Sequence, residues 1–243
     1  MEDIQKTLEN AARTASDKGL TLYTRFLDPA EAEWGKQAAR RYGVRFRVWG
    51  GYPHAERVVG CFSPEDEEAG EYPIVCLHSR YASRFCSVSH RDLLGAFMAL
   101  GLTRSCAGDI ISTGEHIYLF AHTQTADFIA QSMKSAGKTP LDFHVMDEVP
   151  EMPEPAGTRF GAVVSSLRLD GIVAAAYKLS RSEAADRIRE GLVKLDHIPC
   201  DRVDAAVREG AMLSLRGKGR VRLVSIDGTT RKQRIGITFF RYE

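Results

Sequence analysis

The chain has 243 residues and a formal net charge of +1, and its 44% hydrophobic and 27% charged content is ordinary for a soluble globular protein. This length accommodates one large domain or two to three small ones. No apolar run approaches the roughly 18 residues that cross a membrane, and Met1–Gln5 lacks the basic-then-apolar order of a secretory signal, so we expect a cytoplasmic protein without a membrane partner.

The charge is distributed unevenly along the chain. Residues 159–243 hold 17 Lys and Arg against 10 Asp and Glu, a net of +7, whereas residues 1–158 hold 16 against 22, a net of −6. A basic C-terminal third beside an acidic remainder is typical of a nucleic-acid-binding appendage. The asymmetry alone does not identify the partner.

The cysteines and histidines do not predict a metal site. The five cysteines form an odd set without a C-x-x-C pair, which argues against structural zinc and against a disulfide framework. His116 and His122 flank a predicted strand, but no acidic pair or third ligand accompanies them. We therefore expect no metal and no cofactor. The cysteines are Cys61, Cys76, Cys86, Cys106 and Cys200.

The first part of the chain predicts two helices followed by a hairpin. Apolar residues recur on one face of residues 1–18, as in a helix. Asp28 is a favourable N-cap for a second helix, and Gly43 ends its apolar pattern. Two strands around a Gly-Gly-Tyr-Pro turn are predicted at Val44–Trp49 and Arg57–Phe62.

The next part predicts the order β-α-β-β-α-β, which is typical of a ferredoxin-like or RRM-like sandwich. The predicted strands are 73–78, 110–113, 116–121 and 141–146. One predicted helix is capped by Ser89-x-x-Asp92 and runs to Gly101, and the other covers residues 126–136. Tyr118 and Phe120 share one face of the third strand, where RRMs stack RNA bases. The basic and glycine positions of the usual RRM motif are absent, so we predict core packing, with a sheet surface that contacts RNA or protein as the alternative.

A proline-rich stretch containing Pro150, Pro153 and Pro155 predicts a linker. Beyond it, residues 160–165 predict a strand that leads into the basic third. The fold class is therefore α+β. The expected domains are a small N-terminal α/β domain (1–71), an RRM-like middle domain (72–149), a linker (150–158) and a C-terminal RNA-binding domain (159–243).

The basic third contains an ordered motif. Leu169, Ile172, Val173 and Ala176 form the buried stripe of one helix. Ser180-Arg181-Ser182-Glu183 fits the capping box of a second helix, which Gly191 ends by allowing a positive φ. Residues 193–195 then read as a strand, and residues 210–217 close the unit.

This order and spacing resembles the S4 RNA-binding domain. Basic residues cover its predicted surface, and Arg216-Gly217-Lys218-Gly219-Arg220 interleaves cations with glycine, which lets guanidinium and amide groups approach phosphates. Arg187 on the second helix belongs to the same basic surface. Arg168 and Asp170 could instead pair with each other or cap the helix.

The resemblance extends to the YlmH family of bacterial S4-domain proteins. It rests on residues 165–170, 179–181 and 215–220, together with His90–Ala96 and Gly108-Asp109-Ile110 in the middle domain. The match covers roughly residues 72–240, whereas the first 70 residues match only in general layout. It is carried by motifs in two domains at the expected separation.

The resemblance implies a ribosome-associated protein that binds ribosomal RNA and tRNA on the large ribosomal subunit. It also implies a role in rescue of stalled peptidyl-tRNA complexes, with a further link to cell-division gene clusters. We expect a monomer that is not an enzyme. By position, the RNA-facing side chains of the family correspond to Arg168, Ser180, Arg181, Lys194, Arg216, Lys218 and Arg220.

One departure from the family pattern concerns the turn after the central strand. Family members usually carry Val-Asn after the lysine, whereas this chain has Leu195-Asp196-His197. A carboxylate at this turn would repel phosphate. Either the turn faces away from RNA, or Lys194 and His197 screen the charge.

An enzyme and a protein-interaction adaptor are the alternatives to an RNA-binding protein. Arg168-Leu169-Asp170 is similar to the R-L-D motif of pseudouridine synthases, but the 73 residues after Asp170 are too few for that catalytic fold, and the chain has neither a phosphate-binding loop nor a methyltransferase motif. An RNA-modifying or hydrolytic enzyme with its site in residues 1–158 is one alternative. The other is a protein-interaction adaptor in cell division.

Overall fold

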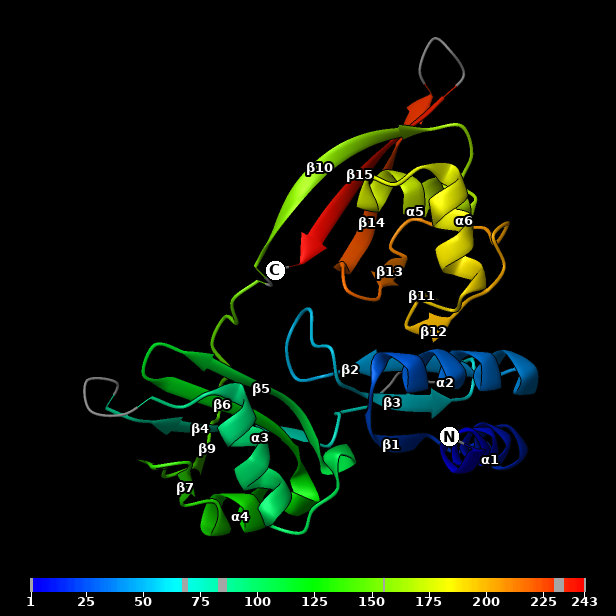
Figure 1. Cartoon of the computed structure of the whole chain (residues 1–243). Helices are drawn as coiled ribbons and strands as arrows, with labels where there is room; N and C mark the ends of the chain where they lie inside the picture. Colours follow the sequence, from blue (N-terminus) through cyan, green and yellow to red (C-terminus); the bar gives the residue numbers. More distant parts are fainter. Residues whose placement is uncertain (1, 67–69, 83–86, 155, 230–233, 243) are drawn as a thin grey trace. The chain divides into compact units, whose positions relative to one another are not determined.

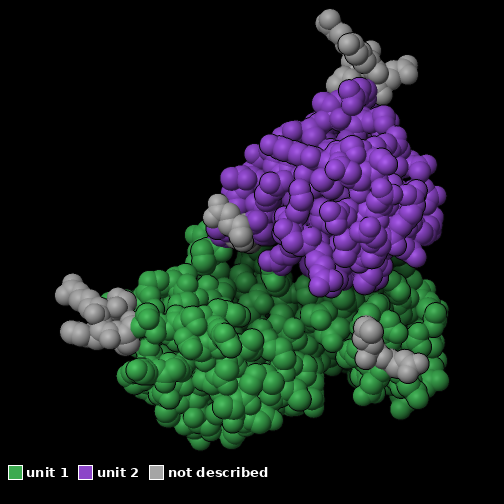
Figure 2. All heavy atoms as spheres, viewed as in Figure 1, with its two compact units in different colours: residues 1–153 green, residues 154–243 purple. Residues whose placement is uncertain are grey.

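A computed structural model describes residues 2–66, 70–82, 87–154, 156–229 and 234–242. Cys86 and Pro155 lie outside the described residues. The chain divides into two compact units, residues 1–153 and residues 154–243 (Figure 2). Each unit has its own sheets and hydrophobic core.

The first unit begins with two helices and a three-stranded antiparallel sheet of order β1-β3-β2. Both predicted helices and the β2–β3 hairpin are confirmed, whereas β1 was not predicted. Leu8, Ala12 and Phe62 are among the buried residues that join the helices to the sheet. The elements are α1 (Glu2–Lys18), β1 (Leu22–Leu27), α2 (Pro29–Tyr42), β2 (Arg45–Trp49) and β3 (Val58–Ser63).

Local interactions fix the second helix and its sheet. Asp28 and Glu31 form a complete capping box at the start of α2, and Gly43 ends the helix with φ +64°. The ring of Phe46 lies against Gly35 on α2 and Gly60 on β3, where an added Cβ would come within 2.5 Å of the ring. These two glycines therefore allow helix and sheet to pack closely.

The rest of the first unit is an RRM-like sandwich, as predicted. Its antiparallel sheet has the order β5-β6-β4-β9, and α3 and α4 pack on one face through residues such as Leu93, Phe97 and Ile129 (Figure 1). The elements are β4 (Ile74–Arg80), α3 (His90–Ala99), a 3-10 turn (Arg104–Cys106), β5 (Ala107–Thr113), β6 (His116–His122), α4 (Thr123–Ser132), β7 (Ser135–Ala136), β8 (Thr139–Pro140) and β9 (His144–Val145).

The predicted bounds of the last helix and strand were wrong. The helix begins at Thr123, because the His122 ring caps it by accepting a hydrogen bond from the amide of Gln124, and it ends at Ser132. Residues 135–140 form the small β7–β8 hairpin around Gly137, whose φ is +59°. The final strand pairs with β4 over only two residues.

A half-buried polar network joins the two parts of the first unit. The carboxylate of Asp109 accepts hydrogen bonds from the Tyr52 hydroxyl (2.8 Å) and from the amides of Glu56 (2.7 Å) and Arg57 (3.1 Å). The Arg57 guanidinium donates to the carbonyls of Phe26 and Ala107. Segments about 50 residues apart in sequence are therefore held together by one carboxylate and one guanidinium.

The second unit is a six-stranded antiparallel sheet of order β10-β15-β14-β13-β11-β12, with α5 and α6 side by side on one face (Figure 1). Both predicted helices are confirmed, but the long strands β14 and β15 were not predicted. The elements are β10 (Gly157–Val164), α5 (Leu169–Tyr177), α6 (Arg181–Arg189), β11 (Val193–Leu195), β12 (Ile198–Pro199), β13 (Met212–Leu215), β14 (Gly219–Thr229) and β15 (Ile235–Tyr242).

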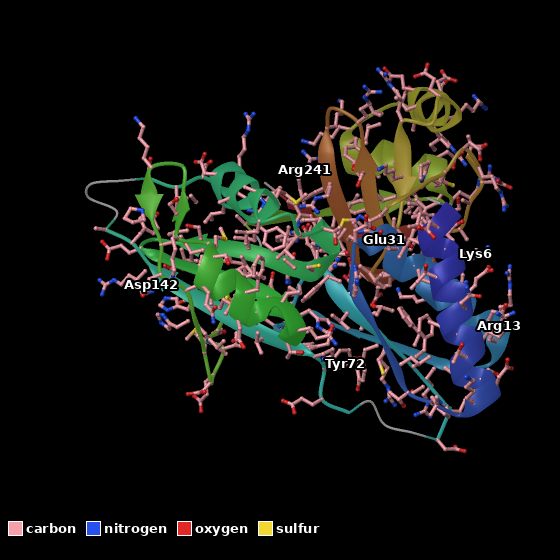
Figure 3. All side chains as sticks on the ribbon, turned by 90° about the horizontal axis from the view of Figure 1, so that it is seen from below. Lys6, Arg13, Glu31, Tyr72, Asp142 and Arg241 are labelled. Carbon is pink, nitrogen blue, oxygen red and sulfur yellow. The ribbon has the colours of Figure 1, made fainter. Side chains whose placement is uncertain are left out.

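Side chains also tie the first helix of this unit to its sheet. Arg241 on β15 (Figure 3) donates to the carbonyl of Ala176 at 2.6 Å, and its guanidinium lies 5.2 Å from the centre of the Phe160 ring. The buried Tyr177 hydroxyl lies 3.1 Å from each of the carbonyls of Leu213 and Gly219. Within the described part of the chain, no helix is long and apolar enough to span a membrane.

Substituting Asp109→Ala should destabilise the first unit. Three donors would lose their acceptor in a half-buried place, and a cost of roughly 2–3 kcal/mol is expected from such losses. Urea unfolding of the full chain measures the change. The control is Asp127→Ala on the exposed side of α4, which should change stability by less than about 0.5 kcal/mol. Equal stability of the two variants would contradict a joining role for Asp109.

Candidate RNA-binding site

The first turns of α5 and α6 meet at the carboxylate of Asp170. Arg181 donates to it from Nε (3.0 Å) and Nη2 (3.3 Å), and the amide of Gly171 donates at 2.8 Å. The Nε atom of Arg168 lies 3.6 Å from the same carboxylate. The structure therefore brings Arg168 and Arg181, which are 13 positions apart in sequence, onto one buried anion.

Asp170 is only 6% exposed and is held in its charged form. Burial opposes its ionisation, but hydrogen bonds from Arg181 and Gly171 and the charges of Arg181 and Arg168 outweigh burial, so its pKa lies below the ordinary value. The side chains of Arg168 and Arg181 stay 48% and 54% exposed. Each guanidinium is therefore fixed on one side and open to solvent on the other.

Ser180 has a capping role at the start of α6. Its Oγ accepts a hydrogen bond from the amide of Glu183, and its own amide donates to the Glu183 carboxylate at 2.8 Å. Hydrogen bonds from the Ser180 amide and hydroxyl lower the pKa of Glu183, and the charges of Arg187 and Lys218 add to the effect.

The β13–β14 hairpin presents Arg216 and Lys218 to solvent. Gly217 and Gly219 both have φ +80°, a conformation that favours glycine. The amide of Arg216 donates to the carbonyl of Leu192, and the amide of Lys218 donates to that of Leu215. Backbone hydrogen bonds thus fix the place of both cations.

The remaining predicted site residues lie elsewhere. Lys194 pairs across strands with Ser214, which pairs with Arg220, and this row alternates with core residues, so it lies on the sheet face opposite the helices. Arg187 lies on the last turn of α6, 3.9 Å from Glu190. The predicted residues thus form a helical group and a sheet group, with the Arg216–Lys218 turn as the link between β13 and β14.

The carboxylate of Asp196 has a structural partner. Asp196 and His197 have φ values of +48° and +67°, as in the tight turn of a two-residue hairpin. The Asp196 carboxylate accepts a hydrogen bond from the amide of Met212 at 2.8 Å. An asparagine could accept the same bond through its carbonyl oxygen, which explains why either residue suits this turn.

The middle sheet carries an unpredicted cluster of rings. The Nε2 atom of His78 lies 2.9 Å from Nδ1 of His116, and its Nδ1 atom lies 3.4 Å from Nε2 of His144. Tyr118 stacks on His78 at 5.1 Å. Sequence spacing did not find the cluster, because only the strand register places His78 and His144 opposite each other.

The predicted core packing of Phe120 is confirmed, since this residue is fully buried and stacks on Tyr52 at 4.9 Å. Tyr118 is half-buried and packs against the same core cluster. Among the described residues, no group of three or more His, Cys, Asp or Glu has an arrangement that could hold a metal ion. The described cysteines form no disulfide.

Three family descriptions match the chain in succession. "YlmH, N-terminal" matches residues 1–61, "Putative RNA-binding domain in YlmH" matches residues 65–148, and "S4 domain" matches residues 167–213. The Bacillus subtilis (strain 168) protein named "Ribosome-associated protein quality control protein P2" is 36% identical over 222 residues, which are 90% of this chain and 86% of that protein.

A solved structure with the description "Cell division protein ylmH from Streptococcus pneumoniae" is also similar. Its TM-score is 0.52 and its sequence identity is 20%, over 60% of this chain and 90% of that chain. At this identity the likeness concerns the fold alone. It agrees with the mixed helix and antiparallel-sheet architecture described above.

Substituting Asp170→Asn should destabilise the second unit by about 3 kcal/mol at neutral pH, because the exchange leaves two guanidinium groups without their buried anion. The loss should shrink in acid. The contribution of the native carboxylate to stability is complete above its unfolded pKa near 3.9 and disappears as the pH falls through its lower folded pKa. Denaturant unfolding at pH 7 and pH 3 measures both effects.

The matched control is Asp186→Asn, which removes an exposed ion pair of 3.0 Å with Arg189 on α6. That change should cost less than about 1 kcal/mol. A similar loss from both variants would argue against Asp170 as the organising charge.

The ring cluster should make stability depend on pH. Burial, and then the neighbouring His116 and His144, lower the pKa of His78 below its ordinary 6.5. The folded chain therefore takes up this proton less readily than the unfolded chain, and stability present above about pH 6.5 is lost as the pH falls towards the folded value.

Unfolding free energies measured between pH 8 and pH 5 should fall less steeply in His78→Gln than in the unsubstituted chain. The exposed His90 at the start of α3 provides the control, and His90→Gln should leave the slope unchanged. Identical slopes for all three proteins would refute the effect of the cluster.

Proposed function

The chain belongs to the YlmH family, and from this premise we propose that it binds ribosomal RNA and tRNA on the large ribosomal subunit, without catalysis, during rescue of stalled translation. The relative that covers most of its length is named for ribosome-associated quality control. Such a protein acts in the cytoplasm. We further propose that it does so as a monomer.

The observations that carry the proposal are the pair of arginines held by Asp170 and the exposed cations of the β13–β14 hairpin. Arg168 and Arg181 each offer a half-exposed guanidinium, while Arg216 and Lys218 lie on a turn fixed by the backbone. Fixed cations of this kind bind phosphate oxygens at a small entropic cost. The contacts select for the shape of the RNA backbone rather than for base sequence.

The environment of Asp170 also disfavours an enzymatic role for the Arg-Leu-Asp motif. A nucleophilic aspartate needs an accessible oxygen, whereas this carboxylate is 6% exposed and receives hydrogen bonds from Arg181 and Gly171 on its oxygens. This supports a structural rather than a chemical role for the motif.

We also propose the domain division 1–71, 72–149, linker 150–158 and 159–243. Three separate family matches, to residues 1–61, 65–148 and 167–213, support it. The first two domains would act as one body in binding, since the Asp109 network and a shared apolar cluster join them.

The double substitution Arg216→Glu and Lys218→Glu should abolish co-sedimentation of the protein with large ribosomal subunits. Both side chains are exposed on a turn held by backbone hydrogen bonds, so the reversal changes charge without disturbing the core. The logarithm of the binding constant falls as the logarithm of the salt concentration rises, and each lost phosphate contact should make this fall less steep by about 0.9. Reversal of Arg181 is unsuitable, because a second carboxylate would then face the buried Asp170.

The control is Lys6→Glu with Arg13→Glu on α1 (Figure 3), which makes the same change in net charge in the first unit. This variant should sediment as the unsubstituted protein does. Retained sedimentation of the folded hairpin variant would overturn the role of the hairpin, and failure of the unsubstituted protein to sediment would overturn the proposed function.

A further inference from the structure

The sheet face opposite α5 and α6 carries cations and aromatic rings in two rows. Strand register places Lys194, Ser214 and Arg220 in line on β11, β13 and β14, and the Arg220 guanidinium lies 5.2 Å from the centre of the Tyr242 ring on β15. The second row contains Met212, Arg222, Phe240 and Arg159 on β13, β14, β15 and β10.

The side chains of these rows alternate with the core residues of the same strands. Val221, Leu223 and Phe239 are fully buried in the core against the helices. Successive side chains in a strand point to opposite faces. Arg220, Arg222 and Phe240 therefore lie on the other face. We use the name strand-face strip for six residues of that face: Arg159, Lys194, Arg220, Arg222, Phe240 and Tyr242.

The rings of the strip are only partly covered. Phe240 and Tyr242 are half-buried, and they pack edge to face with centroids 4.9 Å apart. Gly157 leaves room for the Phe240 ring, since an added Cβ there would come within 2.5 Å of it. Arg159, Lys194 and Arg222 are exposed.

The charge of the strip is one-sided. It holds four cations. Asp196 lies at the β11 end of the second row, where its carboxylate accepts a hydrogen bond from the amide of Met212, and a further carboxylate on the same face belongs to Asp227. That carboxylate accepts hydrogen bonds from the hydroxyls of Ser225 and Thr238 at 2.5 and 2.7 Å. A polyanion fits this surface. An apolar partner without negative charges would leave the positive charge of the guanidinium groups unbalanced.

We propose that the strand-face strip binds a single-stranded segment of RNA, with its bases on Tyr242 and Phe240 and its phosphates on Arg159, Lys194, Arg220 and Arg222. The inference rests on the proposed function and extends it to a second binding surface. The six residues of the strip lie on β10, β11, β14 and β15. Of these strands, β10, β14 and β15 lie wholly outside residues 167–213, the range that matches the S4 domain.

An unpaired strand suits this surface better than a duplex. Bases can stack on protein rings only when they are unstacked from each other, as in loops and single strands. The strip crosses five neighbouring strands, from β10 to β11. At a spacing of about 4.8 Å these strands span about 19 Å, which is room for several cation contacts along one backbone. Among the described residues, no aromatic ring contact involves Arg168, Asp170 or Arg181, so the two surfaces would recognise different features of RNA.

Replacing Tyr242 tests the stacking. Binding of the full chain to a fluorescent oligouridylate of about 12 nucleotides should weaken about fivefold or more in Tyr242→Ala, as expected for loss of one base–ring contact. Tyr242→Phe keeps a ring and should bind as the unsubstituted protein does. Circular dichroism and denaturant unfolding establish that both variants are folded.

Charge reversal tests the backbone contacts. The salt dependence of binding should be weaker in the double variant Arg159→Glu with Arg222→Glu. The fall of log K with log salt should become less steep by at least about 1.4, since each single-strand phosphate contact contributes about 0.7. Lys6→Glu with Arg13→Glu on α1 is again the control of equal charge. The oligomer probe is uncharged in its bases, so the salt slope reports phosphate contacts.

The outcomes separate this inference from the proposed function. If the unsubstituted chain sediments with large subunits but does not bind the oligomer, or if the strip variants bind it normally, the strip does not bind single-stranded RNA. The strip variants could instead change the self-association of the RNA-free protein and leave binding of the oligouridylate intact. In that case the strip is a self-association surface, and the inference is overturned. Loss of sedimentation by the unsubstituted chain counts against the proposed function.

Discussion

A carboxylate that is removed from water must find cations or hydrogen-bond donors, and Asp170 imposes this requirement on the second unit. It is satisfied by Arg181 and Arg168 from the two helix starts and by the amide of Gly171. The two guanidinium groups consequently lie at fixed places on the surface. The buried carboxylate thus determines where the cations of this unit lie, and hence where we expect it to bind an anion.

The first unit uses a carboxylate in a similar way. Asp109 on β5 receives the Tyr52 hydroxyl and two amides of the segment before β3, so that the RRM-like sandwich and the N-terminal sheet share one polar contact. Phe26 and Phe120 extend the joint with buried apolar surface. The N-terminal part is therefore a compact body, and the net charge of −6 of residues 1–158 contrasts with the +7 of the basic third.

Turn chemistry decides where the cations of the second unit lie. Positive φ values at Gly217, Gly219, Asp196 and His197 close two tight hairpins. The β13–β14 hairpin aligns Ser214 with Arg220, whereas the pairing of β11 with β13 aligns Lys194 with Ser214. The departure at Asp196 concerns the same geometry, since its carboxylate accepts the amide of Met212. A residue that appears unsuited to RNA binding in the sequence has a role in holding the sheet together.

Sequence patterns determined most of the helices and their caps and the succession of folds, because these depend on contacts between near neighbours. The N-cap at Asp28, the capping boxes at Ser89 and Ser180 and the RRM-like order are present as predicted. Sequence patterns could not determine the long strands β14 and β15, whose pairing extends to the distant strand β10, or the start of α4, which the His122 ring caps. For the same reason the basic residues were predicted as one surface, and only the tertiary structure decided that register and burial divide them. Arg168 and Arg181 are placed by the buried charge of Asp170, whereas Lys194 and Arg220 are placed by the alternation of side chains along a sheet.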